Sequence, residues 1–305
     1  MLEVLKFQNS LFISFYLLLA SHLSQLLKDT YDVSVFDIKT PLNNVKFIQG
    51  TIEDKEQILN AVKDQDIIIH LAASVGVKNT EDDPIQTMNT NLLGTKNLLD
   101  ACSKTDIKKI IFSSSSEVYG EPKKIPIDES QIPIPVTTYG ISKLAAEEYV
   151  KIFSEKFDFK YTILRFFNAI GKNQAENFVL TEFINNAKNN KPIIIHGSGL
   201  QIRAFCDIKD ICQGVTKSID SGDNEIINIG NDMEPISIEN LAKKIIELLD
   251  SKSTIKYIPF AESGRHRKVE ILSRVPNIKK AKQLLSYEPI YDLKHSIGQI
   301  SDMTI

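Results

Sequence analysis

The stretch KIIFSSSSEVYG, residues 109–120, indicates the fold class of this 305-residue chain. Its apolar start has the length and composition of a buried β-strand, and a run of serines follows directly. Similar apolar runs alternate with segments that carry apolar residues at helical spacing. The other runs are Asp32–Phe36, Asp66–Leu71 and Lys160–Leu164, and the helical segments are Ser21–Asp29, Lys55–Val62, Asn91–Ser103 and Ser142–Phe153.

Alternation at this rhythm predicts an α/β fold, a doubly wound parallel sheet with helices on both faces. In such folds ligands bind beyond the carboxyl ends of the strands, so polar residues that follow apolar runs are candidate site residues. After about Leu164 the rhythm loosens into shorter strand and helix signals. We therefore expect a second, smaller domain that packs closely on the first and closes a cleft with it.

The overall composition is ordinary for a globular protein, with 42% hydrophobic and 25% charged residues. A net charge of −3 gives no basic surface, so no nucleic-acid partner is expected. The three cysteines, Cys102, Cys206 and Cys212, show no metal-ligand or CxxC spacing. Reduced thiols in a cytoplasm fit this pattern better than disulfides, and no metal is expected.

One apolar segment near the start, Leu11–Ala20, complicates the compartment. It is too short to span a bilayer as a helix, although a signal peptide could contain such a run. We favour a buried strand followed by a helix start, because Asp37 has the position expected for the end of the next strand. No membrane partner is therefore expected.

Tyr139 and Lys143, in the sequence YGISK, lie four residues apart at the start of a predicted helix and share one face. A lysine ammonium close to a phenol favours the phenolate, which can then exchange protons near neutral pH. The pattern alone is weak, because any helix can carry it on a solvated face. Its position about two dozen residues after the strand-end serines makes it much more specific.

Together with further segments, these motifs resemble the NAD-dependent epimerase/dehydratase family of nucleotide-sugar enzymes, in the extended short-chain dehydrogenase/reductase superfamily. The similarity runs from about Ser21 to about Pro289. It implies a Rossmann-type NAD-binding domain over residues 1–166 and a nucleotide-sugar domain over residues 167–305, with or without interleaving. The further segments are His70-Leu-Ala-Ala73, Asn91-Leu-Leu-Gly-Thr95, Arg165-Phe-Phe-Asn168, Arg203-Ala-Phe205, Asn228-Ile-Gly-Asn231 and Arg274-Val-Pro-Asn-Ile-Lys-Lys-Ala281.

The resemblance also implies catalytic roles. Tyr139 would take the proton from a sugar hydroxyl, and Lys143 would tune Tyr139 and hold the nicotinamide ribose. Ser115 would share the proton network of that hydroxyl, and Glu117 would complete the catalytic set.

The binding residues follow from the same resemblance. Leu71, Ala72, Ala73 and Asn91 would lie against the cofactor, together with Tyr139 and Lys143. Asn168, Arg203 and Arg267 would contact the sugar nucleotide, where guanidinium groups suit a pyrophosphate. In Arg203-Ala-Phe205, Ala204 replaces the aspartate that is usual in this motif.

Asp37 ends the run DVSVFD. A carboxylate at this point accepts hydrogen bonds from the adenosine ribose of NAD and repels the 2′-phosphate of NADP. No arginine follows immediately, so NAD is the expected cofactor.

The chain departs from the family where a glycine-rich turn should bring the backbone to the pyrophosphate. No glycine precedes Gly50, and the three glycine positions fall on Ser14, Leu17 and Ala20. Ala20 is tolerable, but Leu17 places a branched side chain where the pyrophosphate should lie. Three explanations remain open: a frameshift or misassigned start, a paralogue that no longer binds NAD, or an active enzyme with an altered phosphate loop.

Three functions remain in competition. Dehydratases of the family carry Asp-Glu where this chain has Ser116-Glu117, and without that aspartic acid 4,6-dehydration loses its usual acid. We predict 4-epimerisation of a UDP-hexose through a transient 4-keto sugar. The first alternative is UDP-glucuronate decarboxylation, because the Ser-Glu pair and Arg274–Ile278 resemble the decarboxylases. The second is a non-catalytic homologue that binds sugar nucleotides.

Family members commonly form homodimers through the helices that here carry Asn91 and Tyr139. Leu92, Leu98, Leu99 and Ala145 are compatible with such an interface. The same residues could instead belong to the core of the domain.

Overall fold

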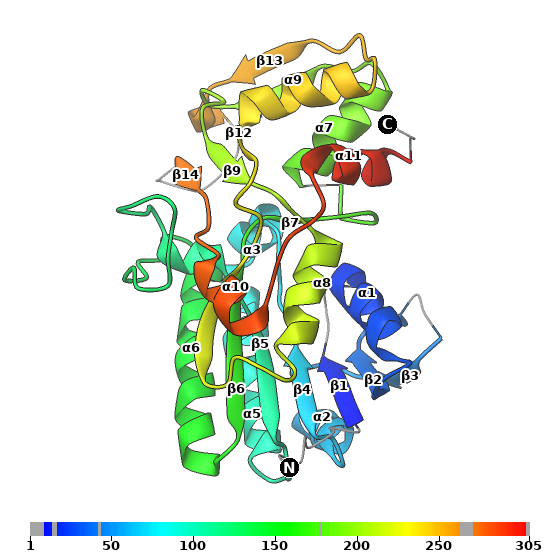
Figure 1. The fold of residues 1–305 in the computed structure, drawn as a ribbon, viewed down its shortest axis with the longest axis vertical. Helices are drawn as coiled ribbons and strands as arrows, with labels where there is room; N and C mark the ends of the chain where they lie inside the picture. The colour runs from blue at the N-terminus through cyan, green and yellow to red at the C-terminus, as the bar shows by residue number, and fades with distance from the viewer. Residues whose placement is uncertain (1–8, 14–16, 42–43, 177, 263–270, 303–305) are drawn as a thin grey trace.

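A seven-stranded parallel sheet forms the centre of the computed structural model, which describes residues 9–13, 17–41, 44–176, 178–262 and 271–302 (Figure 1). Its strand order reverses between β1 and β4, which is the topological switch point where ligands bind in doubly wound sheets. The predicted α/β class and parallel sheet are therefore confirmed. In order across the sheet the strands are β3 (Lys46–Gln49), β2 (Asp32–Asp37), β1 (Asn9–Ile13), β4 (Ile67–His70), β5 (Lys109–Ser115), β6 (Lys160–Phe166) and β11 (Glu225–Ile229).

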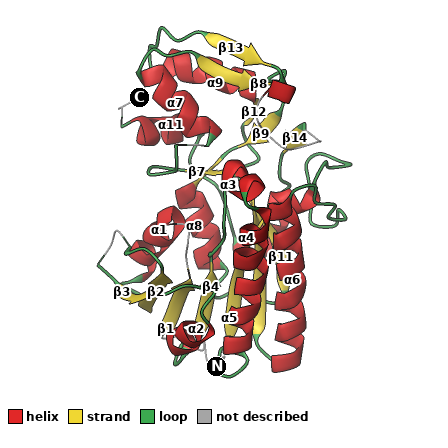
Figure 2. Ribbon diagram, turned by 180° about the vertical axis from the view of Figure 1, so that it is seen from behind, coloured by secondary structure: helices red, strands yellow, loops and turns green. Residues whose placement is uncertain are grey.

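Both faces of the sheet are covered, which explains the nearly continuous apolar runs. Ile67 and Ile69 belong to the core on one face, whereas Ile68 belongs to the core on the other. Each such fully buried side chain contributes about 1.5–3 kcal/mol. The first core is closed by α1 (Leu17–Leu27), α8 (Ile208–Lys217) and α10 (Lys279–Leu285). The second is closed by α2 (Lys55–Val62), α5 (Gly94–Cys102) and α6 (Thr138–Phe157), which Figure 2 shows.

The apolar segment Leu11–Ala20 contributes a strand and a helix start, as favoured above. β1 pairs with β2 on one side and with β4 on the other, so it lies inside the sheet. The helix α1 then begins at Leu17, four residues before the predicted Ser21. Among the described residues, no helix is long and apolar enough to cross a membrane.

A smaller layer lies above the carboxyl ends of the strands (Figure 1) and has its own core of side chains such as Ile184, Ile195 and Ile245. It contains α7 (Val179–Lys188), α9 (Ile238–Leu248), α11 (Leu293–Ser301) and the parallel pair β8 (Ile193–His196) and β13 (Ile255–Ile258). A second small sheet joins β12 (Pro235–Ser237), β9 (Ile202–Ala204) and β14 (Ser273–Arg274). Two-residue strands β7 (Ala169–Ile170) and β10 (Cys206–Asp207) also pair with each other.

Short helices connect the strands near the switch point. After β4 come α3 (Val77–Asp82), α4 (Pro84–Met88) and the π-helical turn η1 (Asn89–Leu93), and η2 (Ser116–Tyr119) follows β5. A further 3-10 turn, η3 (Phe260–Glu262), follows β13. The three cysteines are buried and none forms a disulfide.

Candidate active site

A cavity of about 280 Å³ lies where the carboxyl ends of β4 and β5 face the smaller layer. Several peptide segments far apart in sequence form its walls, so it exists only in the folded chain. One wall consists of Ser113–Glu117, Tyr139 and Lys143, and the opposite wall includes Phe166, Asn168–Ile170, Phe178, Phe205 and Ile208.

The serine run bends the chain into this cavity. Ser113, Ser114 and Ser115 end β5, and the Oγ of Ser115 accepts a hydrogen bond from the backbone N–H of Glu117 at 3.2 Å. This contact starts the 3-10 turn η2, which places Glu117 at the cavity wall. Strand-end serines therefore have a structural role as well as a position beside the predicted proton-transfer groups.

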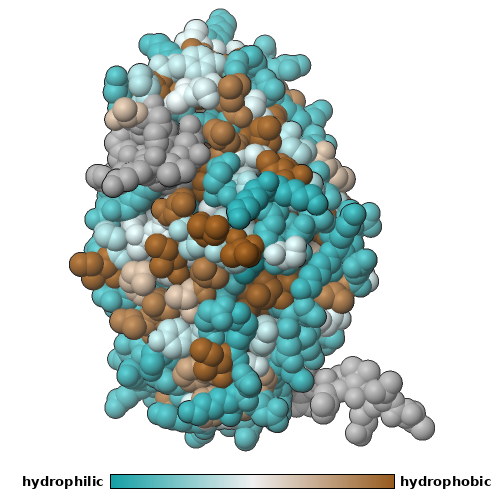
Figure 3. Space-filling view, turned by 90° about the vertical axis from the view of Figure 1, so that its left-hand side faces the viewer, coloured by the Kyte–Doolittle hydropathy of each residue, from teal (hydrophilic) through white to brown (hydrophobic). Residues whose placement is uncertain are grey.

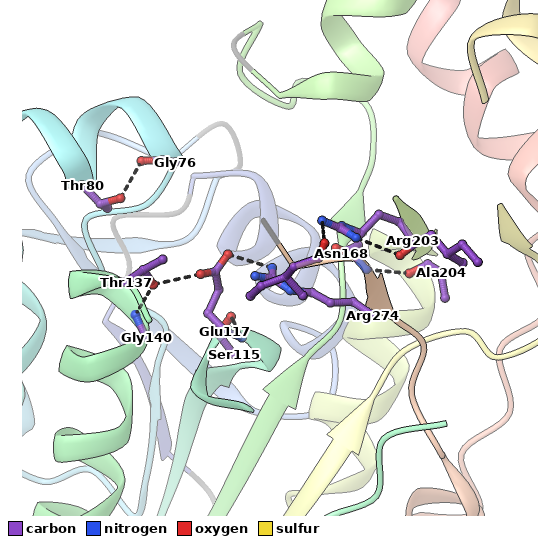
Figure 4. Close-up of polar contacts among 12 residues, drawn as sticks. Gly76, Thr80, Ser115, Glu117, Thr137, Gly140, Asn168, Arg203, Ala204 and Arg274 are labelled. Carbon is purple, nitrogen blue, oxygen red and sulfur yellow. Dashed lines mark hydrogen bonds and ion pairs between the residues drawn. The ribbon is translucent and has the colours of Figure 1, made fainter. Parts of the chain in front are cut away.

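Thr137 fixes the start of the helix that carries Tyr139 and Lys143. Its Oγ1 accepts a hydrogen bond from the N–H of Gly140 at 3.0 Å and donates one to Oε2 of Glu117 at 2.9 Å (Figure 4). Gly140 permits close packing, because a Cβ at this position would lie 2.7 Å from the carbonyl oxygen of Glu117. The start of α6 is thus held directly against η2.

Lys143 is buried, with 1% of its surface exposed, and its ammonium donates to the carbonyl oxygen of Ser113 at 2.7 Å. Burial lowers the pKa of Lys143 to about 7, although the negative charge of Glu147 raises it. Its Nζ lies 6.0 Å from the centre of the Tyr139 ring. The predicted Tyr-Lys pair is therefore brought together with Ser115 and Glu117 on one cavity wall.

Arg274 is a cavity residue to which the sequence reasoning assigned no role, although the RVPN segment contains it. It comes from β14 and binds Oε1 of Glu117 through Nη1 at 2.7 Å (Figure 4). Only 6% of the residue is exposed, and its Nε and Nη2 have no hydrogen-bond partner among the described residues. A buried guanidinium with unused donors in a cavity wall can receive an anionic or strongly polar ligand group.

The predicted substrate residues are placed differently from one another. Asn168 lines the cavity, and its Nδ2 donates to the carbonyl oxygen of Ala204 at 3.0 Å. Arg203 donates to the carbonyl oxygens of Ile202 and Ile271 and does not line the described cavity. Arg267 lies outside the described residues.

The predicted cofactor residues form two groups. Leu71 and Ala73 line the cavity, and Ala72 is buried beside them. The side chain of Asn91 holds this turn, since it accepts from the N–H of Ser74 at 2.6 Å and donates to the carbonyl oxygen of the same residue at 3.2 Å.

Two further predicted cofactor positions lie at the end of β2 and at the start of α1. Asp37 is 4% exposed at the end of β2, and its Oδ1 accepts from the N–H of Lys39 at 2.9 Å. The buried carboxylate of Asp37 is compatible with hydrogen bonding to the adenosine ribose of NAD. Of the three glycine positions, Ser14 lies outside the described residues, whereas Ala20 is buried in α1.

Comparison with known proteins agrees with this geometry. Residues 18–230 match the model of the NAD dependent epimerase/dehydratase family. A Methanocaldococcus jannaschii protein named provisionally as a UDP-glucose 4-epimerase is 34% identical over 92% of this chain and 93% of its own.

Two solved structures show the same fold. The UDP-glucose 4-epimerase of Thermotoga maritima with UDP-glucose has a TM-score of 0.90 at 28% identity, covering 97% of this chain and 98% of the other. The UDP-glucuronic acid 4-epimerase of Bacillus cereus, with UDP-glucuronic acid and NAD, has a TM-score of 0.87 at 27% identity, covering 96% and 98%.

Proposed function

This chain belongs to the NAD-dependent epimerase/dehydratase family, and we propose that it interconverts UDP-hexoses that differ in configuration at C4. The single observation that carries the proposal is the cavity wall that unites Ser115, Tyr139 and Lys143. These groups can move a proton at a sugar hydroxyl, which is the step common to this chemistry.

In this proposal Tyr139 accepts the proton of the 4-hydroxyl and returns it after the sugar has turned. The charge of Lys143 stabilises the phenolate of Tyr139, and the hydroxyl of Ser115 orients the reacting sugar oxygen. When bound, NAD would accept the hydride from C4 and return it. Asp37 and the Leu71–Ala73 turn would hold its two ends.

The opposite wall suits a reaction in which a 4-keto sugar rotates between the two half-steps. Phe166, Phe178, Phe205 and Ile208 contribute apolar surface, which excludes water without fixing the sugar through directed hydrogen bonds. Incubation with UDP-glucose, followed by proton NMR of the anomeric signals, tests the proposal. Formation of UDP-galactose supports it, and unchanged UDP-glucose in the presence of bound NAD contradicts it.

Arg274 favours a second candidate function, in which the substrate carries a carboxylate at C6. Decarboxylation of UDP-glucuronate is such a reaction. Its Nε and Nη2, which have no hydrogen-bond partner among the described residues, lie in the wall formed with Glu117. A guanidinium binds a carboxylate through paired, charge-assisted hydrogen bonds, each worth about 1.5–3 kcal/mol.

For this candidate, Arg274→Met should lower kcat/KM for UDP-glucuronate about a hundredfold more than kcat/KM for UDP-glucose, because about 2.8 kcal/mol of carboxylate binding is lost. Lys243→Met is the control, since this exposed lysine of α9 pairs with Glu239 and does not line the described cavity. Equal losses for both substrates would remove the argument for a uronate. Release of carbon dioxide with a UDP-pentose identifies decarboxylation, and UDP-galacturonate identifies epimerisation.

We further propose that the sheet-bearing part, residues 1–166, serves NAD and that residues 167–305 serve the sugar nucleotide while contributing β11 to the sheet. We place the protein in the cytoplasm, where its three free cysteines would stay reduced.

We also propose a homodimer through the helices that carry Asn91 and Tyr139, namely η1 with α5, and α6. Of the residues named for it, Leu92 and Ala145 are half-buried and stay compatible with an interface. Leu98 and Leu99 are fully buried in the domain core, whereas Leu93, Ile141 and Ile152 are 50%, 48% and 57% exposed. Figure 3 views the molecule from the side of α6 and shows hydrophobic residues gathered across the middle of that face.

Ile152→Asp should convert a dimer to a monomer in sedimentation velocity, because it places a charge in the interface. Lys151→Asp is a nearby control outside the apolar set, and a monomeric wild-type chain would contradict the dimer.

A further inference from the structure

A fully buried ion pair lies directly behind the cavity wall. Glu147 of α6 has no exposed surface, and Arg165 of β6 is 3% exposed. The guanidinium makes two bonds to the carboxylate, from Nε to Oε1 at 2.9 Å and from Nη2 to Oε2 at 2.6 Å. Such a pair is costly to bury, and hydrophobic residues of similar volume often stabilise a protein equally well. Its presence therefore calls for a reason other than stability.

The pair ties several catalytic elements together. Ser114, next to Ser115 on β5, donates its hydroxyl proton to Oε1 of Glu147. The guanidinium carbon of Arg165 lies 4.8 Å from the centre of the Tyr119 ring, and the hydroxyl of Tyr119 donates to Asn228 of β11 at 2.8 Å. One network thus joins the helix of Tyr139 to the strand end of Ser115.

Glu147 also lies one helical turn after Lys143, on the same face of α6. Among the described residues, the other groups around the Lys143 ammonium are the Ser113 carbonyl, the Phe112 ring at 4.9 Å, the Tyr139 ring and His70. Neither the carbonyl nor the Phe112 ring carries a formal charge. Burial and Lys143 keep the pKa of His70 well below its usual value, so His70 is neutral.

The hydrogen bonds around His70 agree with a neutral ring. Thr95 donates its hydroxyl proton to the carbonyl oxygen of Asn91 at 2.6 Å, so His70 must donate from Nε2 to Thr95 at 2.8 Å. Nδ1 is buried without a hydrogen-bond partner among the described residues, which suits the lone pair of a neutral ring better than a charged N–H.

We propose that Glu147, held by Arg165, is a positioning residue that keeps Lys143 charged beneath Tyr139 and fixes the strand end bearing Ser115. This inference deepens the proposed epimerisation and rests on it for its catalytic part. The physical reason is that burial removes water from the Lys143 ammonium, and Glu147 is the fixed carboxylate that replaces part of the lost stabilisation.

The direct test follows Lys143 itself. In protein labelled with carbon-13 at the lysine Cε, a pH titration by NMR measures the pKa of Lys143, whose signal is identified by its loss in Lys143→Met. Glu147→Gln removes the negative charge, so the measured pKa of Lys143 should fall by about one pH unit. Glu148→Gln is the matched control, because this neighbouring glutamate is exposed and pairs with Lys151. An unchanged Lys143 titration in Glu147→Gln would overturn the inference.

Glu147→Gln leaves Arg165 buried without its carboxylate and so threatens folding. Glu147→Gln with Arg165→Met removes both charges and should fold, and a smaller downward displacement of the Lys143 titration is expected, because loss of the Arg165 cation offsets part of the loss of the Glu147 anion. If the double variant folds and Lys143 titrates as in the wild type, the inference fails.

The kinetic readout separates this inference from the proposed function. In an active enzyme the ratio of kcat at pH 6 to kcat at pH 8 should rise up to about tenfold in Glu147→Gln, because Lys143 is neutral over more of that range. A uniform loss at both pH values indicates a purely structural role and contradicts the inference. A wild-type chain that is inactive on UDP-sugars, with the NMR displacement present, contradicts the proposed function alone.

Discussion

Replacing Tyr139 by phenylalanine should lower kcat for interconversion of UDP-glucose and UDP-galactose by about 10³-fold while leaving the fold intact. The substitution removes one hydroxyl from the cavity wall, and with it the group that accepts and returns the sugar proton. General acid–base catalysis by a positioned side chain typically contributes about 10²–10⁴-fold, which sets this magnitude. Initial rates in a coupled assay measure the effect.

The matched control for this substitution is Tyr149→Phe. Tyr149 lies on the same helix and packs against Phe153, with ring centres 6.4 Å apart, so it belongs to the packing along α6 and not to the cavity. Near-normal activity is expected for Tyr149→Phe. A Tyr139→Phe enzyme that keeps a tenth or more of the wild-type rate would mean that another group moves the proton. KM for the UDP-sugar should change little, since the loss concerns the transition state.

Restoring glycine at positions 14, 17 and 20 should tighten NAD binding about a hundredfold. Ser14, Leu17 and Ala20 occupy the places where glycines would let the pyrophosphate reach backbone N–H groups at a helix N-terminus. One or two charge-assisted hydrogen bonds, together about 2.7 kcal/mol, correspond to that factor. Isothermal titration calorimetry of the chain and of the triple glycine variant measures it.

Three outcomes of the glycine experiment distinguish the explanations for this segment. Weak binding by the chain and strong binding by the variant would support a frameshift or misassigned start. Tight binding by the unaltered chain, lost in Asp37→Ala, would show an active enzyme with an altered phosphate loop. Absence of binding in both proteins would identify a homologue that has lost NAD, because the buried Asp37 and the Leu71–Ala73 turn would then not suffice.

Local patterns in the sequence determined most of the first half of the fold. The apolar runs at Asp32–Phe36 and Asp66–Leu71 became β2 and β4, and the helix over Lys55–Val62 has the predicted bounds. These elements were readable because a strand buried on both faces is apolar throughout and an amphipathic helix repeats every 3.6 residues. The YxxxK helix and the strand-end serines were readable for the same reason, since spacing and strand position are local properties.

Contacts between distant residues were decided by the tertiary structure alone. No spacing rule could join Glu117 to Arg274, which are separated by 157 residues, or Glu147 to Arg165 on different elements. Leu98 and Leu99 had the pattern of an interface as much as of a core, and only packing against the sheet placed them inside. The physical reason is that side-chain periodicity identifies an apolar face but not what covers it, whereas burial and ion pairing depend on which elements the chain topology brings together.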